Sequence, residues 1–229
     1  MIIEPIYRYF ALALELGKTS EGSAVALVEL VERLGSPGPA VVPPEKARYE
    51  VRGLRRFTPG TEYGQITDSL RELLDSGPVA EELQQKHVRL PDGGVRPART
   101  QLCWILDQTA VGKPIIDMVL EKFGGPYAHR VIFAGNHTEN EVEGLHYIPK
   151  HLLISEIEVL LEERRLKIGD QHPLAPDLMK ELVNYKERRS APIASANDPW
   201  REQAHDDLVF AVGLACRRLR TVQFQYEFM

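Results

Sequence analysis

Two long apolar runs near the start of the chain limit what it can fold into. The first, "YRYFALALELG" at residues 7–17, is aromatic and apolar up to Glu15 and ends at a glycine, as a buried strand does. The second, "SAVALVELVER" at residues 23–33, follows the short turn "KTSEG" and is predicted to be the return strand of a hairpin. The alternating "ARYEVRGLRRF" at residues 47–57 predicts a third antiparallel strand.

After these strands, helical and strand patterns alternate. Residues 63–77 have helical spacing of apolar side chains, stopped by Gly77 and Pro78. Residues 100–124 predict a strand that ends at Asp107, a glycine-containing turn, and a helix that opens near Pro114. A further strand is predicted at 129–135, and further helices at 149–166, at 175–189 and within 203–219. This order predicts an α/β fold, a mixed sheet flanked by helices.

Length and composition predict one globular domain over residues 1–229, with a loop rich in proline and glycine near 35–45. No run reaches the roughly 18 apolar residues of a membrane span, and the start lacks the features of a signal peptide, so we expect a soluble cytoplasmic protein with no membrane partner. The net charge of −5 excludes a strongly basic DNA-coating protein but allows a local basic face. Cys103 and Cys216 are predicted to be buried, reduced thiols.

Carboxylates stand beside apolar runs at three places. Glu15 ends the first strand, Asp107 ends a later strand, and Asp206 and Asp207 precede the apolar run of the last helix. Charged side chains are rarely buried unless they are paired or bind a metal. If the three elements converge, the carboxylates repel one another unless cations bind between them. Oxygen ligands suit Mg²⁺ or Mn²⁺, and two such ions about 4 Å apart can support phosphodiester cleavage.

Each acid also has a purely structural interpretation. Asp206 suits the N-cap of the last helix, and Asp207 suits the positive end of its dipole. Asp107 could form a turn at the end of its strand. Glu15 could pair with Lys18 or project from an edge strand. Local sequence leaves both interpretations open for every one of these residues.

Three stretches follow one another in a recognisable order: "WILDQTAVGKPIIDMVLE", "GLHYIPKHLLISEIEVLLEERRLKI" and "HDDLVFAVGLACRRL". Together they resemble the nuclease domain of bacteriophage terminase large subunits, which has an RNase H-like fold, and "YFALALELGKTSEGSAVALVEL" is similar to the first hairpin of that domain. The resemblance covers nearly the whole chain. It implies a metal-dependent endonuclease that cuts double-stranded viral DNA during genome packaging, with a terminase ATPase, a small subunit and a portal as possible partners.

The resemblance also implies roles for particular residues. It implies a carboxylate triad of Glu15, Asp107 and one of Asp206 or Asp207, binding two Mg²⁺ or Mn²⁺ ions, with His205 close by. His205 could orient a metal-bound water or merely precede the helix cap. Lys150 opens a predicted helix, where the dipole disfavours a cation, so it could be either a solvated lysine or a contact to a phosphate.

The chain departs from the family pattern in two ways. Glu15 stands where the family usually has aspartate, and its extra methylene is expected to weaken metal affinity. Residues 1–229 also begin directly at the nuclease-like part, so we expect no ATPase domain within them. Two other functions therefore stay open: a catalytically degenerate module that binds DNA or a partner, and another RNase H-like nuclease such as a junction resolvase.

Overall fold

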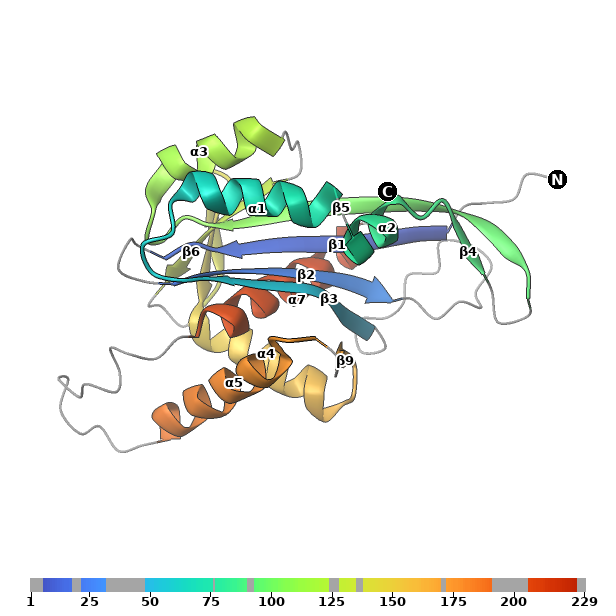
Figure 1. Cartoon of the computed structure of the whole chain (residues 1–229). Helices are drawn as coiled ribbons and strands as arrows, with labels where there is room; N and C mark the ends of the chain where they lie inside the picture. The colour runs from blue at the N-terminus through green and yellow to red at the C-terminus, as the bar shows by residue number, and fades with distance from the viewer. Residues whose placement is uncertain are drawn as a thin grey trace, which may run out of the picture.

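A computed structural model describes residues 6–17, 22–31, 48–75, 77–89, 93–123, 128–134, 138–169, 172–190 and 206–225. Within these ranges the chain forms a mixed nine-stranded sheet flanked by six helices, which is an α/β fold (Figure 1). None of the described helices is both long enough and apolar enough to cross a lipid bilayer.

The sheet has an antiparallel half and a parallel half. The antiparallel half contains β1 (Ile6–Glu15), β2 (Ser23–Val31) and β3 (Arg48–Phe57). The parallel half begins where β5 (Val95–Asp107) pairs with β1, and continues through β6 (Ala128–Ala134) and β8 (Leu145–Pro149). The order is β7-β8-β6-β5-β1-β2-β3-β9, with β4 (His87–Arg89) paired to β5 and short edge strands β7 (Asn140–Val142) and β9 (Leu166–Ile168).

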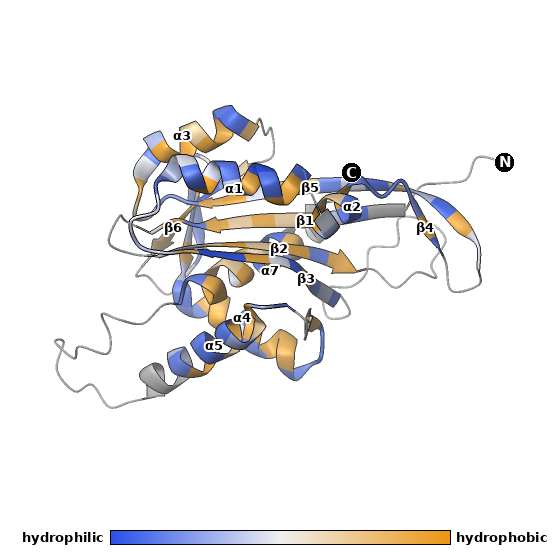
Figure 2. Cartoon of the chain, in the orientation of Figure 1, coloured by the Kyte–Doolittle hydropathy of each residue, from blue (hydrophilic) through white to orange (hydrophobic). Residues whose placement is uncertain are grey.

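Helices cover both faces of the sheet, so the central strands are buried on both sides. One face carries α1 (Tyr63–Asp75), α2 (Gly77–Gln84) and α3 (Gly112–Phe123). The other carries α4 (Lys150–Glu162), α5 (Ala175–Ser190) and α7 (Asp207–Gln225) (Figure 1). Figure 2 shows the hydrophobic colour concentrated in the central strands, while hydrophilic residues follow the outer sides of the helices.

The segment "FALALEL" of β1 alternates large and small side chains, and this alternation distinguishes the two faces. Phe10, Leu12 and Leu14 pack in the core beneath α1 and α3, whereas Ala11 and Ala13 face α7. On β2, Ala24 and Ala26 continue the surface of small side chains. Because successive strand residues point to opposite faces, Glu15 is placed on the α7 face.

Helix α7 also packs closely against α4. A Cβ atom placed on Gly213 would lie 2.8 Å from Leu153 Cβ, closer than carbon atoms pack, and 3.4 Å from both Ile157 Cδ1 and the Leu153 carbonyl oxygen. Glycine at this position therefore sets the distance between the two helices, and with it the position of α7 over the sheet.

We expect Gly213→Ala to destabilise the protein although alanine is the better helix former. Overpacking costs about 1–3 kcal/mol, which exceeds the gain of about 1 kcal/mol from helix propensity. The matched control is Gly64→Ala in α1, where a Cβ would meet nothing within 4 Å. Urea unfolding should show a lower midpoint for Gly213→Ala and an unchanged or higher midpoint for Gly64→Ala. A higher midpoint for both variants would contradict the close packing.

The predicted α/β class, the first three strands and the strand ending at Asp107 are confirmed. Cys103 and Cys216 are free thiols as predicted, but of the two only Cys216 is buried, and Cys103 is partly exposed. The predicted stop of the helix at Gly77 and Pro78 is confirmed, because α1 ends at Asp75 and Gly77 has φ +69°; the second helix that begins at Gly77, α2, was not predicted. Strands β4, β7, β8 and β9 were not predicted, since three to five residues are too few to show a period. The loop near 35–45 lies outside the described residues.

Candidate carboxylate site

Glu15 and Asp107 are the last residues of neighbouring parallel strands. The register pairs Leu14 of β1 with Leu106 of β5, so Glu15 and Asp107 each follow a paired residue by one position. They therefore share the α7 face of strands whose axes lie about 5 Å apart. Both side chains are buried, with 8% of Glu15 and 1% of Asp107 exposed. The structure thus brings together two of the predicted site residues.

Thr109 orients the Asp107 carboxylate. The Thr109 backbone N–H donates to Asp107 Oδ1 at 2.9 Å, and the Thr109 hydroxyl donates to the same oxygen at 2.5 Å. Thr109 Oγ1 in turn accepts the Phe133 backbone N–H at 2.7 Å, which ties this turn to β6. Asp107 Oδ2 receives no hydrogen bond from the residues that the structure describes. The predicted turn-forming role of Asp107 is confirmed and uses only one of its two oxygens.

Burial makes Asp107 a weaker acid than an exposed aspartate. Desolvation raises its pKa from 3.8 to about 6, although the hydrogen bonds from Thr109 and the charge of Lys150 act in the opposite direction. The ionised form is therefore costly in the folded protein without a bound cation. Such a raised pKa in a polar corner of a fold is typical of functional carboxylates, although structural networks also produce it.

Glu181, which no local sequence signal marks as a site residue, caps α7. Glu181 of α5 is 5% exposed, and its Oε2 accepts the backbone N–H groups of Leu208 at 3.0 Å and Val209 at 3.2 Å. Arg56 of β3 forms an ion pair with the other oxygen of Glu181. These are the amides that an N-cap side chain binds, so Glu181 caps α7 from a different helix.

Asp207 lies against the start of β2. A Cβ placed on Gly22 would be only 2.6 Å from Asp207 Oδ2, so this carboxylate occupies space that any other residue at position 22 would fill. Ala24 pairs with Glu15, and Gly22 lies two residues before Ala24. Two residues span about 7 Å of extended chain. Asp207 is therefore placed at the same end of the sheet as Glu15 and Asp107.

Lys150 begins α4 and lies between two aromatic rings. Its Nζ is 4.8 Å from the centre of the Phe133 ring and 4.3 Å from that of Phe210 in α7. The negative faces of these rings stabilise a cation at a helix start where the dipole disfavours it. The charge of Lys150 also acts on Asp107, so the ammonium group belongs to the same corner.

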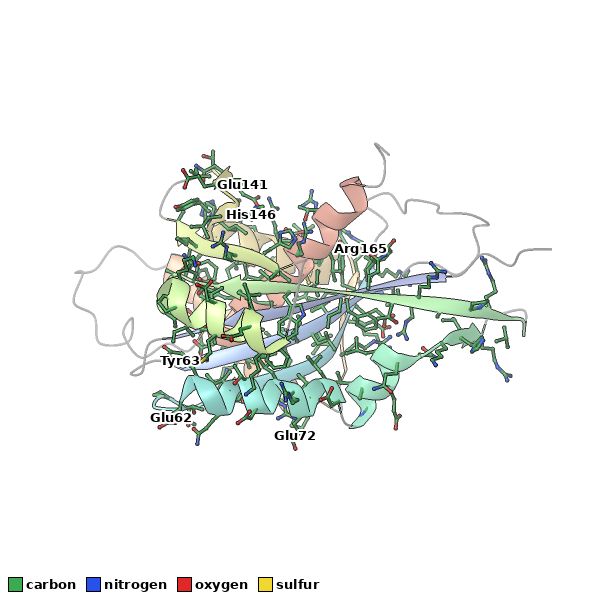
Figure 3. All side chains as sticks on the ribbon, turned by 90° about the horizontal axis from the view of Figure 1, so that it is seen from above. Glu62, Tyr63, Glu72, Glu141, His146 and Arg165 are labelled. Atoms are coloured by element: carbon green, nitrogen blue, oxygen red, sulfur yellow. The ribbon has the colours of Figure 1, made fainter. Side chains whose placement is uncertain are left out.

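The hairpin end beside Glu15 is held by two hydrogen bonds. The Gly17 backbone N–H donates to Ser23 Oγ at 3.1 Å, and the Tyr63 hydroxyl donates to the Gly17 carbonyl at 3.1 Å. Figure 3 shows Tyr63 and Glu62 together at the start of α1. Tyr63 therefore links α1 to the segment that follows Glu15, and fixes the carboxyl end of β1.

The shared metal site itself stays a prediction. Among the ranges described above, no group of three or more His, Cys, Asp or Glu side chains is arranged to hold a metal ion. Asp206 precedes α7, and its carbonyl accepts the Phe210 N–H at 3.0 Å. The predicted site residue His205 lies outside the described residues.

A scan against protein-family models found no match, and a search of curated proteins found no significant relative.

Proposed function

We propose that this chain is a nuclease domain of RNase H-like fold, related to terminase large subunits, that cleaves double-stranded DNA with divalent metal ions. The proposal rests on one observation above all. Two buried carboxylates, Glu15 and Asp107, end neighbouring parallel strands on the same face, and Asp207 lies at the same end of the sheet. The mixed sheet with helices on both faces is compatible with such a fold.

The residues of this corner suit a hard divalent cation. Glu15, Asp107 and Asp207, with Asp206 as the alternative ligand, supply the carboxylate oxygens that Mg²⁺ and Mn²⁺ prefer. Asp107 Oδ2 accepts no hydrogen bond from a described residue, and the carboxyl group is costly to ionise without a cation. Bound ions, two in the terminase-like scheme, would activate water and stabilise the leaving oxygen of a phosphodiester.

The chain's own side chains then have distinct roles. Thr109 holds Asp107 in one orientation, and Glu181 fixes the start of α7 and so the place of Asp207. Lys150, held between Phe133 and Phe210, is suited to contact a phosphate oxygen beside the carboxylates. His205 and Asp206 directly precede Asp207 in the sequence, so both remain candidate residues of this proposed site.

One observation favours the alternative function, a DNA- or partner-binding module without activity. The ammonium group of Lys150 already offsets part of the charge of Asp107, and it would oppose a second cation at short distance. A module of this kind would bind duplex DNA without cutting it.

Cleavage assays with the purified chain separate these functions. Supercoiled plasmid, linear duplex and a four-way junction should be incubated with Mn²⁺, with Mg²⁺ and with a chelator. We expect cutting of plasmid and linear duplex in Mn²⁺ and none with the chelator. Preference for the junction would instead support a resolvase. DNA binding with no cutting in either metal would support the degenerate module.

Gly22→Ala offers a test of Asp207 that removes no carboxylate. The new methyl group would lie 2.6 Å from Asp207 Oδ2, so the carboxylate must change position. Because small displacements of a catalytic group cost up to about 100-fold, we expect Mn²⁺-dependent cleavage to fall at least about tenfold. The control is Gly169→Ala, where a Cβ would meet nothing within 4 Å. Unchanged cleavage in Gly22→Ala would remove Asp207 from the site.

A further inference from the structure

A two-stranded arm extends from the sheet at the end opposite the carboxylates. It consists of β4 and the first residues of β5, in which His87 pairs with Pro97 and Arg89 pairs with Val95. Figure 1 shows this hairpin projecting beyond the helices that cover the sheet. Lys86, His87, Arg89 and Arg99 are exposed. We call the hairpin that carries these four residues the cationic arm.

The charge of this segment is opposite to that of the chain as a whole. Residues 86–100 contain four Lys or Arg and one Asp, giving +3, whereas the full chain has a net charge of −5. Among the residues that the structure describes, Lys86, Arg89 and Arg99 make no ion pair, whereas Arg8, Arg52 and Arg217 each pair with a glutamate. The arm therefore presents cations that no carboxylate in the described part of the chain neutralises.

The arm and the carboxylate site share one face of the sheet. Alternation along β5 places Arg99 on the face of Cys103 and Asp107, and cross-strand pairing places His87 and Arg89 there too. Arg218 of α7 reaches this face at a midpoint, where its charge acts on Cys103 and lowers the pKa of that thiol against the effect of burial. Cationic groups thus follow β5 from the arm toward the site at intervals of four residues, or about 13 Å.

The root of the arm is anchored by a buried ion-pair network. Arg8 of β1 is 7% exposed, and its guanidinium donates to the Glu82 carbonyl at 2.9 Å and to Gln85 Oε1 at 2.5 Å, just before β4 begins. Arg8 also pairs with Glu29 at 2.7 Å and with Glu82 Oε2 at 2.6 Å. A ligand that binds the arm therefore orders little additional backbone.

We propose that the cationic arm binds the phosphate backbone of duplex DNA about one helical turn from the bond at the carboxylate site. Arg99 and Asp107 are eight residues apart, about 26 Å along an extended strand, and Arg89 is some four residues further out. A turn of B-DNA spans about 34 Å, so one duplex can contact both ends of the sheet. This inference rests on the proposed function for its choice of DNA as the polyanion.

An anionic membrane fits the arm less well than a duplex does. Membrane surfaces bind basic segments most firmly when apolar side chains insert beside them. On the described part of the arm, the exposed large apolar side chain is Val95, at 55%. The cations instead lie on the two paired strands of one hairpin, with Arg89 on β4 and Arg99 on β5, and a nucleic acid presents a comparable row of phosphates.

Duplex binding in the presence of EDTA tests the arm separately from cleavage. Arg89→Ala/Arg99→Ala should be compared with Lys167→Ala/Lys180→Ala, which removes the same charge from exposed positions on β9 and α5. Binding of a fluorescent 30-bp duplex should be measured across a salt series. Each phosphate contact contributes about 0.9 to the slope of log K against log salt. The arm variant should therefore lose about 1.8 from the slope and bind about 30-fold more weakly at 0.15 M salt.

The control variant should keep the parental slope and change affinity by less than about twofold. Both variants should keep the parental melting temperature, because all four residues are exposed. An unchanged slope in the arm variant, or an equal loss in the control, would overturn the proposal. Binding of phosphatidylserine vesicles or polyglutamate in place of the duplex would also overturn the proposal. This experiment measures DNA binding and not cleavage. A finding that the chain does not cut DNA would therefore leave the result for the arm unchanged.

Discussion

Replacing Asp107 by asparagine is expected to abolish Mn²⁺-dependent DNA cleavage and, at the same time, to stabilise the metal-free protein. Asparagine keeps an acceptor oxygen for both Thr109 hydrogen bonds but cannot supply the charge that a metal ion needs. Loss of a ligand that stabilises transition-state charge costs several kcal/mol, so we expect at least about a 1000-fold fall in rate. The control is Asp117→Asn in α3, an exposed carboxylate paired with Lys113.

The stabilisation should depend on pH in a defined direction. The pKa of Asp107 rises from 3.8 to about 6 in the folded protein, so the folded state holds a proton that the unfolded state has lost between these values. Wild-type stability therefore falls as pH rises through this window, by about 3 kcal/mol in total. Asp107→Asn lacks this loss. In urea unfolding with EDTA, the gain in stability of Asp107→Asn over the wild type should be absent near pH 4 and complete above pH 6. Identical unfolding curves of the two proteins at pH 7.5 would show that ionised Asp107 does not destabilise the fold.

Substitutions of Glu15 should change the choice of metal. Mg²⁺ requires near-ideal octahedral geometry, so a ligand displaced by one methylene is expected to support Mn²⁺ better than Mg²⁺. We expect the parent to cut faster in Mn²⁺, Glu15→Asp to raise cutting in Mg²⁺, and Glu15→Ala to lower cutting in both metals by about 100-fold, or about 3 kcal/mol. Cleavage rates in each metal, measured at saturating DNA, provide the test.

Three outcomes have distinct meanings for Glu15. If Glu15→Asp and Glu15→Ala both cleave like the parent, Glu15 is not a ligand. If the parent is inactive in both metals but Glu15→Asp is active, the natural chain is the degenerate binding module. If Glu15→Asp lowers activity in both metals, the buried position of Glu15, which is 8% exposed, fits only the longer side chain.

The sequence was sufficient to predict the central strands and their terminal acids, for a physical reason. The alternation in "FALALEL" and the apolar run before Asp107 are local signals, and carboxyl ends of neighbouring parallel strands necessarily meet. That β1 pairs with β5 is not a local signal, and the convergence of Glu15 and Asp107 depends on it. The register had to come from the structure.

Other parts of the site depend on contacts between distant residues. Glu181 lies 27 positions before Leu208, and nothing in the helical pattern of α5 distinguishes it from a solvent-facing glutamate. The aromatic rings that contact Lys150 are those of Phe133 in β6 and Phe210 in α7, and the sequence pattern does not distinguish either from a core residue. The cationic arm was not predicted because β4 has three residues, which are too few to show the alternation of a strand.

The capping of α7 by Glu181 has a consequence for how mutations in this chain would be interpreted. Glu181 and its partner Arg56 determine where the backbone amides at the start of α7 lie. In a selection for activity, loss of Glu181 would resemble loss of Asp207, although Glu181 is remote from the predicted motifs. The effect of one substitution would then depend on the other, so the pair would show strong epistasis without sharing a chemical role.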